Sequence, residues 1–174
     1  MTRKDIIIAI DPDIDKSGLA VLAPQERLLT VYDFTLPEMV EFFREIRKIY
    51  AEQGLSYVIV VEASYLIHAN WHLDWNDSKN RAAAKGKQVG RNHEIGRQIV
   101  EFCKYYDMPY EEKKPLTKCW AGKDGKISAE ELEMLLDGMG IQPLKTRTNQ
   151  EKRDAALLAL DRSGLPLRMG KKQR

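Results

Sequence analysis

The stretch Asp5-Ile6-Ile7-Ile8-Ala9-Ile10-Asp11-Pro12 decides the fold of this chain. Its apolar run does not alternate with polar residues, which is typical of a strand buried on both faces. A turn-like segment ending in Ser17-Gly18 leads into a second apolar run from Leu19 to Ala23, so we expect two antiparallel strands joined by a tight turn. This places Asp11 at the end of a buried strand, at the edge of the sheet. A carboxylate is costly to bury there without a partner, and a metal cation is the natural candidate.

The composition is that of an ordinary globular protein. The chain has 174 residues, of which 43% are hydrophobic and 31% charged, and this suits a single domain with a real core. We expect that domain over residues 1–161 and a flexible basic tail over 162–174. Because no apolar run approaches the roughly 18 residues of a membrane span and no secretory signal is recognisable, we expect a cytoplasmic protein with no membrane partner. Cys103 and Cys119 lack metal-ligand spacing and should be reduced thiols.

The remaining elements follow from periodicity and from capping residues. Residues 28–34 predict a third strand, which completes an antiparallel meander. Apolar positions over 37–53 recur at helical spacing, and 57–62 is again an unbroken apolar run that ends in Glu62. Since a helix joins the meander to this run, its strand should lie parallel and adjacent to the first. The pattern further predicts a helix over 81–106 that starts near Ser78, a short strand over 108–112, a helix opened by a capping box of Ser128 and Glu131, and a last helix capped by Thr148 or Asn149.

Four carboxylates stand at positions where these elements should meet. Asp11 and Glu62 end neighbouring parallel strands, and the carboxyl ends of such strands are the usual place for a site. Glu151 and Asp154 are three residues apart and share a face in the first turn of the last helix. Acidic residues there can simply complement the helix dipole, but here they follow two acid-ended strands. Hard oxygen ligands of this kind suit Mg²⁺ or Mn²⁺, and a pair of such ions can cleave a phosphodiester.

Basic residues are segregated along the chain, although the formal net charge is only +2. The segment from Lys79 to Arg97 contains six basic residues and one glutamate, and the segment from Lys113 to Lys126 contains five lysines and one aspartate. Such clusters are typical of a protein that binds a polyanion, with nucleic acid the usual partner. The alternative is that they are solvated faces. The candidates in the first cluster are Lys85, Lys87 and Arg91.

Residues 65–86 contain an aromatic and polar segment that predicts a long functional loop. Trp71 and Trp75 could stack on unpaired bases, or could equally anchor the loop or a dimer. His68, His72 and His93 have no triad-like or ligand-like partner, so loop or packing roles are expected for them.

These residues resemble a known family, the RuvC-like Holliday-junction resolvases of the RNase H-like superfamily. The resemblance runs from Ile6 to about Leu160. It rests on the strand into Asp11-Pro12 with Ser17-Gly18 following, the strand into Glu62-Ala63-Ser64-Tyr65, the helix around Gly86-Lys87-Gln88-Val89-Gly90, the Lys113/Lys114 region, and Glu151-Lys152-Arg153-Asp154-Ala155. It implies an α/β RNase H-like fold: a mixed five-stranded sheet, made of a three-strand antiparallel meander plus parallel strands, flanked by helices.

The resemblance also implies roles for individual residues. It makes Asp11, Glu62, Glu151 and Asp154 the ligands of two Mg²⁺ (or Mn²⁺) ions and gives Tyr65 a contact with the junction. A lysine that assists the phosphate would be Lys113, Lys114 or Lys118. The chain departs from the family pattern at Asp13, where glycine is usual, at Glu151, where Asp is often found, and in the long 67–80 loop. Asp13 and Asp15 are expected to be solvent-exposed turn residues rather than ligands.

These observations lead to one main functional prediction and two alternatives. The main prediction is a metal-dependent, structure-selective endonuclease that cleaves branched DNA, a four-way Holliday junction, as a homodimer. The first alternative keeps the fold and the metals but acts on another nucleic acid, such as a flap or structured RNA. The second is a noncatalytic nucleic-acid-binding module, for which four uncompensated carboxylates facing phosphates bring no advantage.

Overall fold

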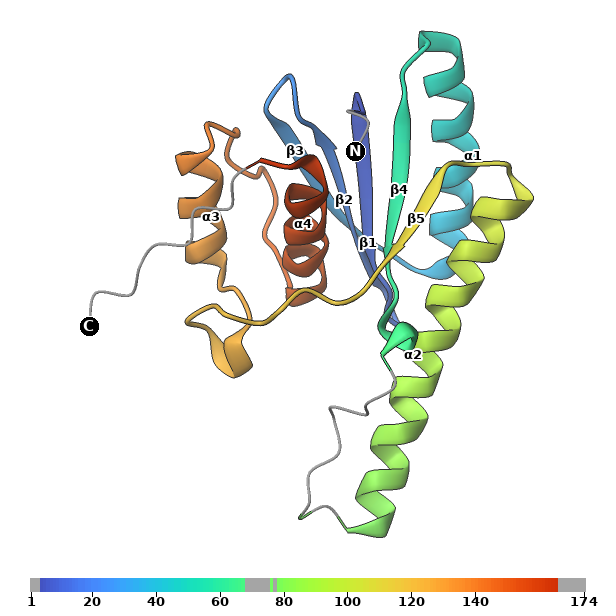
Figure 1. Cartoon of the computed structure of the whole chain (residues 1–174), viewed down its shortest axis with the longest axis vertical. Helices are drawn as coiled ribbons and strands as arrows, with labels where there is room; N and C mark the ends of the chain where they lie inside the picture. The colour runs from blue at the N-terminus through green and yellow to red at the C-terminus, as the bar shows by residue number, and fades with distance from the viewer. Residues whose placement is uncertain (1–3, 68–75, 77, 166–174) are drawn as a thin grey trace.

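A computed structural model describes residues 4–67, 76 and 78–165 of the chain. Its centre is a five-stranded sheet made of β1 (Ile6–Asp11), β2 (Ser17–Ala23), β3 (Leu28–Phe34), β4 (Tyr57–Glu62) and β5 (Tyr110–Lys113). The strand order is β3-β2-β1-β4-β5 (Figure 1). β1, β2 and β3 form an antiparallel meander, while β4 lies parallel to β1 and β5 parallel to β4. The predicted mixed sheet and the predicted neighbour relation of β1 and β4 are therefore confirmed.

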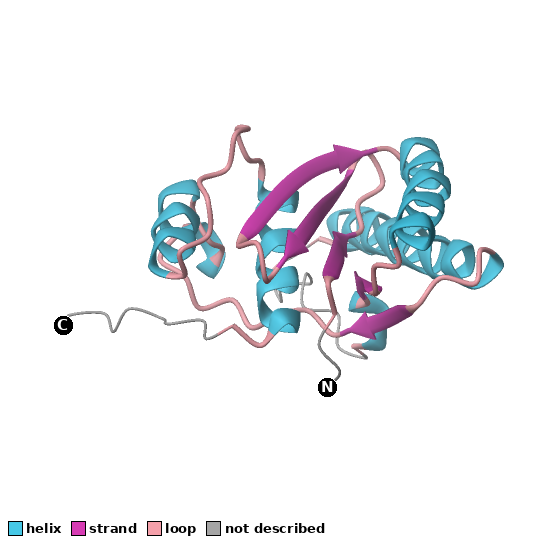
Figure 2. Cartoon of the chain, turned by 90° about the horizontal axis from the view of Figure 1, so that it is seen from above, coloured by secondary structure: helices cyan, strands magenta, loops and turns pink. Residues whose placement is uncertain are grey.

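The described residues form four α-helices, which cover the two faces of the sheet. α1 (Leu36–Gln53) and α2 (Lys79–Tyr105) lie on one face, and α3 (Ala129–Gly138) and α4 (Gln150–Ser163) lie on the other (Figures 1 and 2). Alternate residues of the strands supply two cores, since successive side chains of a strand point to opposite faces. Ile8 and Ile10 pack with α1 and α2, whereas Ile7 and Ala9 pack with α3 and α4. This is the arrangement of a mixed sheet flanked by helices that the sequence predicts.

Side-chain caps fix where the helices begin. Thr35 and Glu38 form a reciprocal capping box at α1, and Ser128 and Glu131 form the predicted one at α3. Asn149, one of the two predicted candidates, caps α4 through a hydrogen bond from the Lys152 amide. These caps satisfy amides that would otherwise be unpaired, so the sequence sets the helix starts locally.

Some boundaries differ from the sequence prediction. β5 begins at Tyr110 rather than at 108, because the Met108 amide donates to the Cys103 carbonyl at the end of α2 and Pro109 has no amide hydrogen to donate. α4 continues through Arg162 to Ser163, two residues past the expected domain boundary at 161. Arg162 is buried there, so the first residues of the expected basic tail belong to the last helix, and residues 166–174 lie outside the part of the chain that the structure describes.

Two further expectations concern cysteines and the membrane. Cys103 is buried and Cys119 is exposed, and no disulfide joins the two. Within residues 4–67, 76 and 78–165, no helix is long and apolar enough to cross a bilayer.

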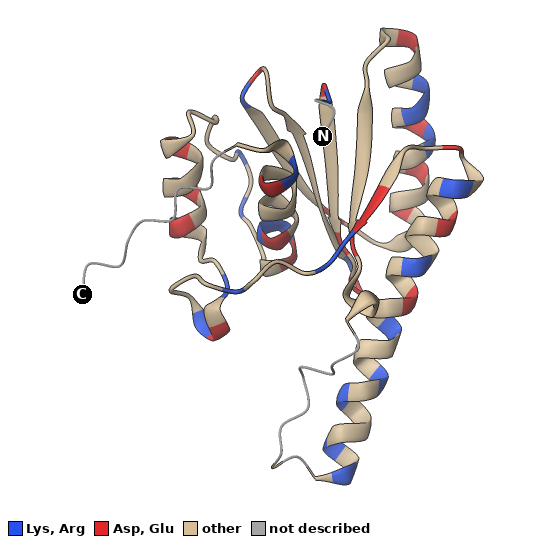
Figure 3. Ribbon diagram, viewed as in Figure 1, with Lys and Arg blue, Asp and Glu red and all other residues tan. Residues whose placement is uncertain are grey.

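α2 extends beyond the edge of the sheet against which it packs. Its buried residues all lie in the second half of the helix, from Ile95 to Cys103. The first half extends past the edge of the sheet, and lysines and arginines are spaced along it (Figures 1 and 3). The fold therefore presents a basic helical arm beside the edge where β1 and β4 end.

Candidate active site

Asp11 and Glu62 lie side by side at the ends of two buried strands. β1 and β4 pair in parallel with Ile10 beside Val61, which puts the two acidic residues at the next position of each strand. Side-chain alternation turns both toward the face covered by α4, because Ile10 and Val61 point to the other face. Both side chains are partly buried. The predicted juxtaposition of the two strand-end carboxylates is thus a consequence of the sheet register.

The first turn of α4 reaches this pair because β2 carries a glycine. Gly18 pairs with Asp11 across the meander, and a Cβ built on Gly18 would lie 2.0 Å from the carbonyl oxygen of Glu151. Only a residue without a side chain allows this approach. An ion pair of 3.0 Å between Lys152 Nζ and the Asp33 carboxylate holds the same turn against β3. Glu151 and Asp154 are thereby brought to the acidic end of β1 and β4.

The carboxylates act on one another electrostatically. Burial raises the pKa of Asp11 well above its ordinary value, and the negative charges of Glu62, Asp154 and Glu151 raise it further. Burial, followed by the charge of Asp154, raises the pKa of Glu62 to about 7. The pKa of Asp154 is also raised, again mainly by burial. Three half-buried acids that resist ionisation in one place form a site that attracts cations.

Two lysines oppose this effect. The charges of Lys118 and Lys126 lower the pKa values of both Glu62 and Asp154, and that of Lys126 also lowers the pKa of Asp11. Lys118 was a predicted candidate, whereas Lys126 was not. The signal for Lys126 was present in the lysine cluster that begins at Lys113, but sequence alone does not say which members of a cluster face the acids.

The donor set suits a hard divalent cation. Carboxylate oxygens are the ligands that Mg²⁺ and Mn²⁺ prefer, and buried like charges gain most from such an ion. Among the residues that the structure describes, no three His, Cys, Asp or Glu side chains approach closely enough to hold a metal as they stand. The chemistry of Asp11, Glu62, Glu151 and Asp154 fits such an ion.

Tyr65 lies next to the acids, directly after β4 in a short 3₁₀ turn (Ser64–Leu66). Its hydroxyl donates a hydrogen bond to Glu112, the Arg97 guanidinium lies 4.9 Å from its ring centroid, and His93 contacts it edge-on. Burial, followed by the Glu112 hydrogen bond, raises its pKa above the ordinary value. A Cβ on Gly96 would lie 3.1 Å from the ring, so α2 supports the tyrosine through a residue without a side chain.

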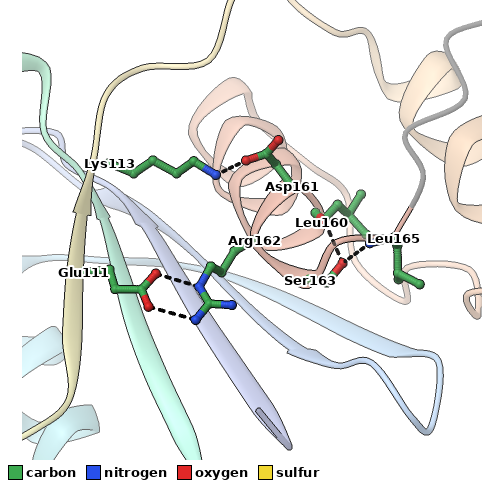
Figure 4. A network of polar contacts seen from close by, with 7 residues as sticks. All are labelled: Glu111, Lys113, Leu160, Asp161, Arg162, Ser163 and Leu165. Atoms are coloured by element: carbon green, nitrogen blue, oxygen red, sulfur yellow. Dashed lines mark hydrogen bonds and ion pairs between the residues drawn. The ribbon is translucent and has the colours of Figure 1, made fainter. Parts of the chain in front are cut away.

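Lys113 forms an ion pair with a carboxylate of this chain and is not left free to bind a phosphate. Its ammonium forms an ion pair with Asp161 of α4, beside the pairing of Glu111 with Arg162 (Figure 4). Lys113 is therefore engaged in holding the edge strand against α4, a role that its place in a basic cluster did not reveal. The pairing could not be read from the sequence, because it depends on which face of β5 the side chain occupies.

The other predicted residues are distributed as follows. Lys114 and Lys118 are exposed on the segment that follows β5. Lys85, Lys87 and Arg91 lie on the first half of α2, the part that extends past the sheet. Trp71 and Trp75, together with His68 and His72, lie outside the described residues.

Asp13 has more contacts than the expected exposed turn residue. Its carboxylate accepts hydrogen bonds from the Asp15 amide and from Asn92 Nδ2, at 3.0 Å each, and the Ile14 amide donates to Asn92 Oδ1. Asn92 thus fastens the β1–β2 turn to α2. Asp15 itself is exposed, as predicted.

Comparisons with known proteins gave structural relatives only. No family model matches the chain, and no curated protein matches it in sequence. Among solved structures it is similar to RuvC of Thermus thermophilus in complex with a Holliday junction substrate, with 18% identity and a TM-score of 0.41 over 92% of this chain and 96% of that one. It is also similar to a second Thermus thermophilus RuvC structure, with 17% identity and a TM-score of 0.39 over 92% and 97% of the two chains. A third similar structure is the yeast mitochondrial Holliday junction resolvase Ydc2, with 9% identity and a TM-score of 0.41 over 92% of this chain and 79% of that one. The similar structures are thus of RuvC and of a Holliday junction resolvase, the kind of protein that the sequence resembles.

Proposed function

We propose that this chain is a metal-dependent endonuclease that cleaves branched DNA at four-way junctions. One observation carries the proposal: Asp11, Glu62 and Asp154 converge from two strand ends and a helix start, and burial together with mutual repulsion raises their pKa values. A protein gains nothing in stability from such a cluster, because each buried carboxylate destabilises its neighbours. Clusters of perturbed acids are typical of catalytic sites.

In this proposal the four acids hold two divalent cations. Asp11 stands between Glu62 on one side and the first turn of α4 on the other, so it would be the central residue of the set that holds the ions. Bound Mg²⁺ supplies an activated water and stabilises the leaving oxygen of a phosphodiester. Lys118 and Lys126, whose charges already act on these carboxylates, offset the charge of the incoming phosphate.

The substrate assignment rests on the basic residues around this edge. The α2 arm with Lys85, Lys87 and Arg91 extends past the acids, and Tyr65 offers an aromatic ring beside them. A duplex or junction arm that follows such a basic surface brings its backbone to the carboxylates. Two symmetric cuts in a four-way junction require two such sites, so we propose that the active species is a homodimer.

The test is a cleavage assay on a synthetic four-way DNA junction with Mg²⁺, Mn²⁺ or EDTA. Asp11→Asn should reduce the cleavage rate at least ~10³-fold, because it would remove the central carboxylate of the metal-holding set, and should leave junction binding in EDTA intact. The matched control is Asp15→Asn, an exposed aspartate of the following turn, which should cleave at the wild-type rate. Full activity of Asp11→Asn, or loss of activity in Asp15→Asn alone, contradicts the site assignment.

A panel of substrates separates the alternatives. Four-way junctions, flaps, linear duplexes and structured RNA are compared at equal concentration with Mg²⁺. Preference for a flap or for RNA keeps the site and changes the substrate. Steeply salt-dependent binding with no turnover on any member identifies a noncatalytic binding module.

A further inference from the structure

A second, cationic pocket lies beside the acidic residues, between the loop that precedes α3 and the first turn of α4. It has a volume of about 350 Å³, and its lining includes Lys123, Lys126 and Ser128 from the loop and Gln150 and Arg153 from α4. This volume is at the lower end of the range for small-ligand sites. The pocket is therefore large enough for a single phosphate group with part of its sugar.

The loop that forms one wall is held in a fixed shape by its own hydrogen bonds. The Trp120 amide donates to the Gly125 carbonyl at 3.0 Å, and the carboxylate of Glu131 accepts from the amides of Ala121 and Ser128 at 2.8 and 3.0 Å. Gly122 leaves no room for a side chain, since a Cβ there would lie 2.3 Å from the Lys126 carbonyl. These contacts organise the cationic residues before any ligand arrives, which lowers the entropic cost of binding.

The positive charges in this pocket act on nearby acids only through space, Lys126 on Asp11, Glu62 and Asp154 and Arg153 on Glu130. Arg153 donates to four uncharged oxygens: the Ile127 and Thr148 carbonyls at 2.9 and 3.1 Å, Thr148 Oγ1 at 3.4 Å and Gln150 Oε1 at 2.8 Å. Within the described part of the chain, neither Arg153 nor the two lysines form an ion pair with a carboxylate. Asp124 is the one acidic residue in the lining. Three cations against one carboxylate, around a preformed pocket, favour an anion.

We propose that this pocket binds a backbone phosphodiester of a nucleic-acid strand, one that neighbours the phosphodiester held at Asp11, Glu62 and Asp154. The inference rests on the proposed function. Lys126 connects the two places, because it lines the pocket and its charge also acts on all three acids. The pocket thus positions the strand, while the acids carry out the chemistry. Lys123 is exposed and, unlike Lys126, is not among the charges that shift the pKa values of the three acids, so it is the specific reporter of the pocket.

The experiment measures the salt dependence of binding to a labelled four-way DNA junction in EDTA, by fluorescence anisotropy from 50 to 400 mM KCl. Each phosphate contact that a cation makes contributes about 0.7–0.9 to the slope of log K against log salt. Lys123→Ala should lower the steepness of the slope by about that amount and weaken binding about 3- to 10-fold at the lowest salt. The control is Lys48→Ala, an exposed lysine on α1 on the opposite face, which should leave the slope unchanged.

The outcomes separate this inference from the proposed function. A lower slope in Lys123→Ala supports the pocket even if Mg²⁺ produces no cleavage, in which case the endonuclease assignment fails alone. Wild-type slopes in Lys123→Ala, in a protein that binds and cleaves junctions, overturn the pocket alone. Inorganic phosphate is titrated in parallel by NMR: saturable binding that Lys123→Ala abolishes, with an unchanged DNA slope, assigns the pocket to a free phosphate and overturns the nucleic-acid assignment.

Discussion

The carbonyl oxygen of Glu151 lies directly against Gly18, at a distance that leaves no room for even one methyl group between β2 and α4. Because Gly18 is the strand partner of Asp11, this contact sets the height of the α4 acids above the sheet. Gly18→Ala should therefore push the first turn of α4 outward. We expect a loss of about 3 kcal/mol in the free energy of unfolding, measured by urea titration, and a larger loss of Mg²⁺-dependent cleavage.

The control for this change is a glycine with free space around it. Gly90 lies in α2, and a Cβ there would meet nothing within 4 Å. Gly90→Ala should raise the free energy of unfolding by about 0.5–1 kcal/mol, since alanine is the better helix former. If the Gly18→Ala protein is as stable and active as wild type, the contact between Gly18 and the Glu151 carbonyl does not determine the position of α4.

Replacing the central acid should stabilise the metal-free protein while it removes function. Burial and three neighbouring carboxylates disfavour the charged form of Asp11. Asp11→Asn keeps the shape and removes the charge, so in EDTA at pH 8 we expect an increase of about 1–3 kcal/mol in the free energy of unfolding. The same variant should show a smaller rise in melting temperature on addition of Mg²⁺. Destabilisation of the metal-free variant would indicate that the carboxylate already has a favourable partner within the fold.

The stability of the metal-free protein should fall between about pH 4.5 and 7. The pKa of Glu62 is raised from 4.5 to about 7 on folding, so in this window the folded state holds a proton that the unfolded state has lost. Stability therefore decreases as the pH rises, by about 2–3 kcal/mol from this group. Urea titrations in EDTA at pH 5, 6, 7 and 8 measure the slope, and Glu62→Gln should flatten it. The exposed Glu52→Gln should leave it unchanged; an equal slope in Glu62→Gln would assign the effect to other groups.

The pair of Glu111 and Arg162 should be worth more than a surface ion pair. Arg162 donates two hydrogen bonds to the Glu111 carboxylate, at 2.6 and 2.8 Å, and its side chain is 6% exposed against 41% for Glu111. Glu111→Ala leaves a buried guanidinium without its partner, and we expect a loss of about 2 kcal/mol in unfolding free energy, reduced from the fully buried case by the exposure of Glu111. The control is Glu41→Ala, which breaks the exposed pair with Arg44 and should cost less than about 0.5 kcal/mol. Equal losses in the two variants would show that burial adds nothing to the pair.

Much of this arrangement could be predicted from the sequence, because local rules determine it. Unbroken apolar runs identified β1 and β4, and the helix between them fixed their parallel pairing, which in turn placed Asp11 beside Glu62. The capping residues of α3 and α4 were also readable, since a cap depends on residues three positions apart. The four proposed ligands remain a prediction about chemistry that the fold makes possible.

The features that the sequence did not reveal depend on distant residues meeting. The bond between Asp13 and Asn92 joins residues 79 positions apart, and the pair of Lys113 and Asp161 depends on the face of an edge strand. Lys126 belongs to the same class, because only the closed loop before α3 brings its charge to the acids. Charge clusters indicate a class of ligand, while the partner of each individual charge is decided by tertiary packing.

Only the second half of α2 packs against the core. The two halves of this continuous helix should therefore differ in their stability against local unfolding. Its 27 residues span about 40 Å, yet none of those before Ile95 is buried. The first three turns, which precede the contacts of Asn92 and His93, can therefore unwind without exposing any core, against a free energy set largely by helix propensity, which Gly86 and Gly90 lower. Amide hydrogens before residue 91 should exchange within seconds, whereas those near Ile99 should exchange only on global unfolding. If junction DNA slows the amide exchange of this arm alone, the DNA stabilises the part of α2 that does not pack against the core.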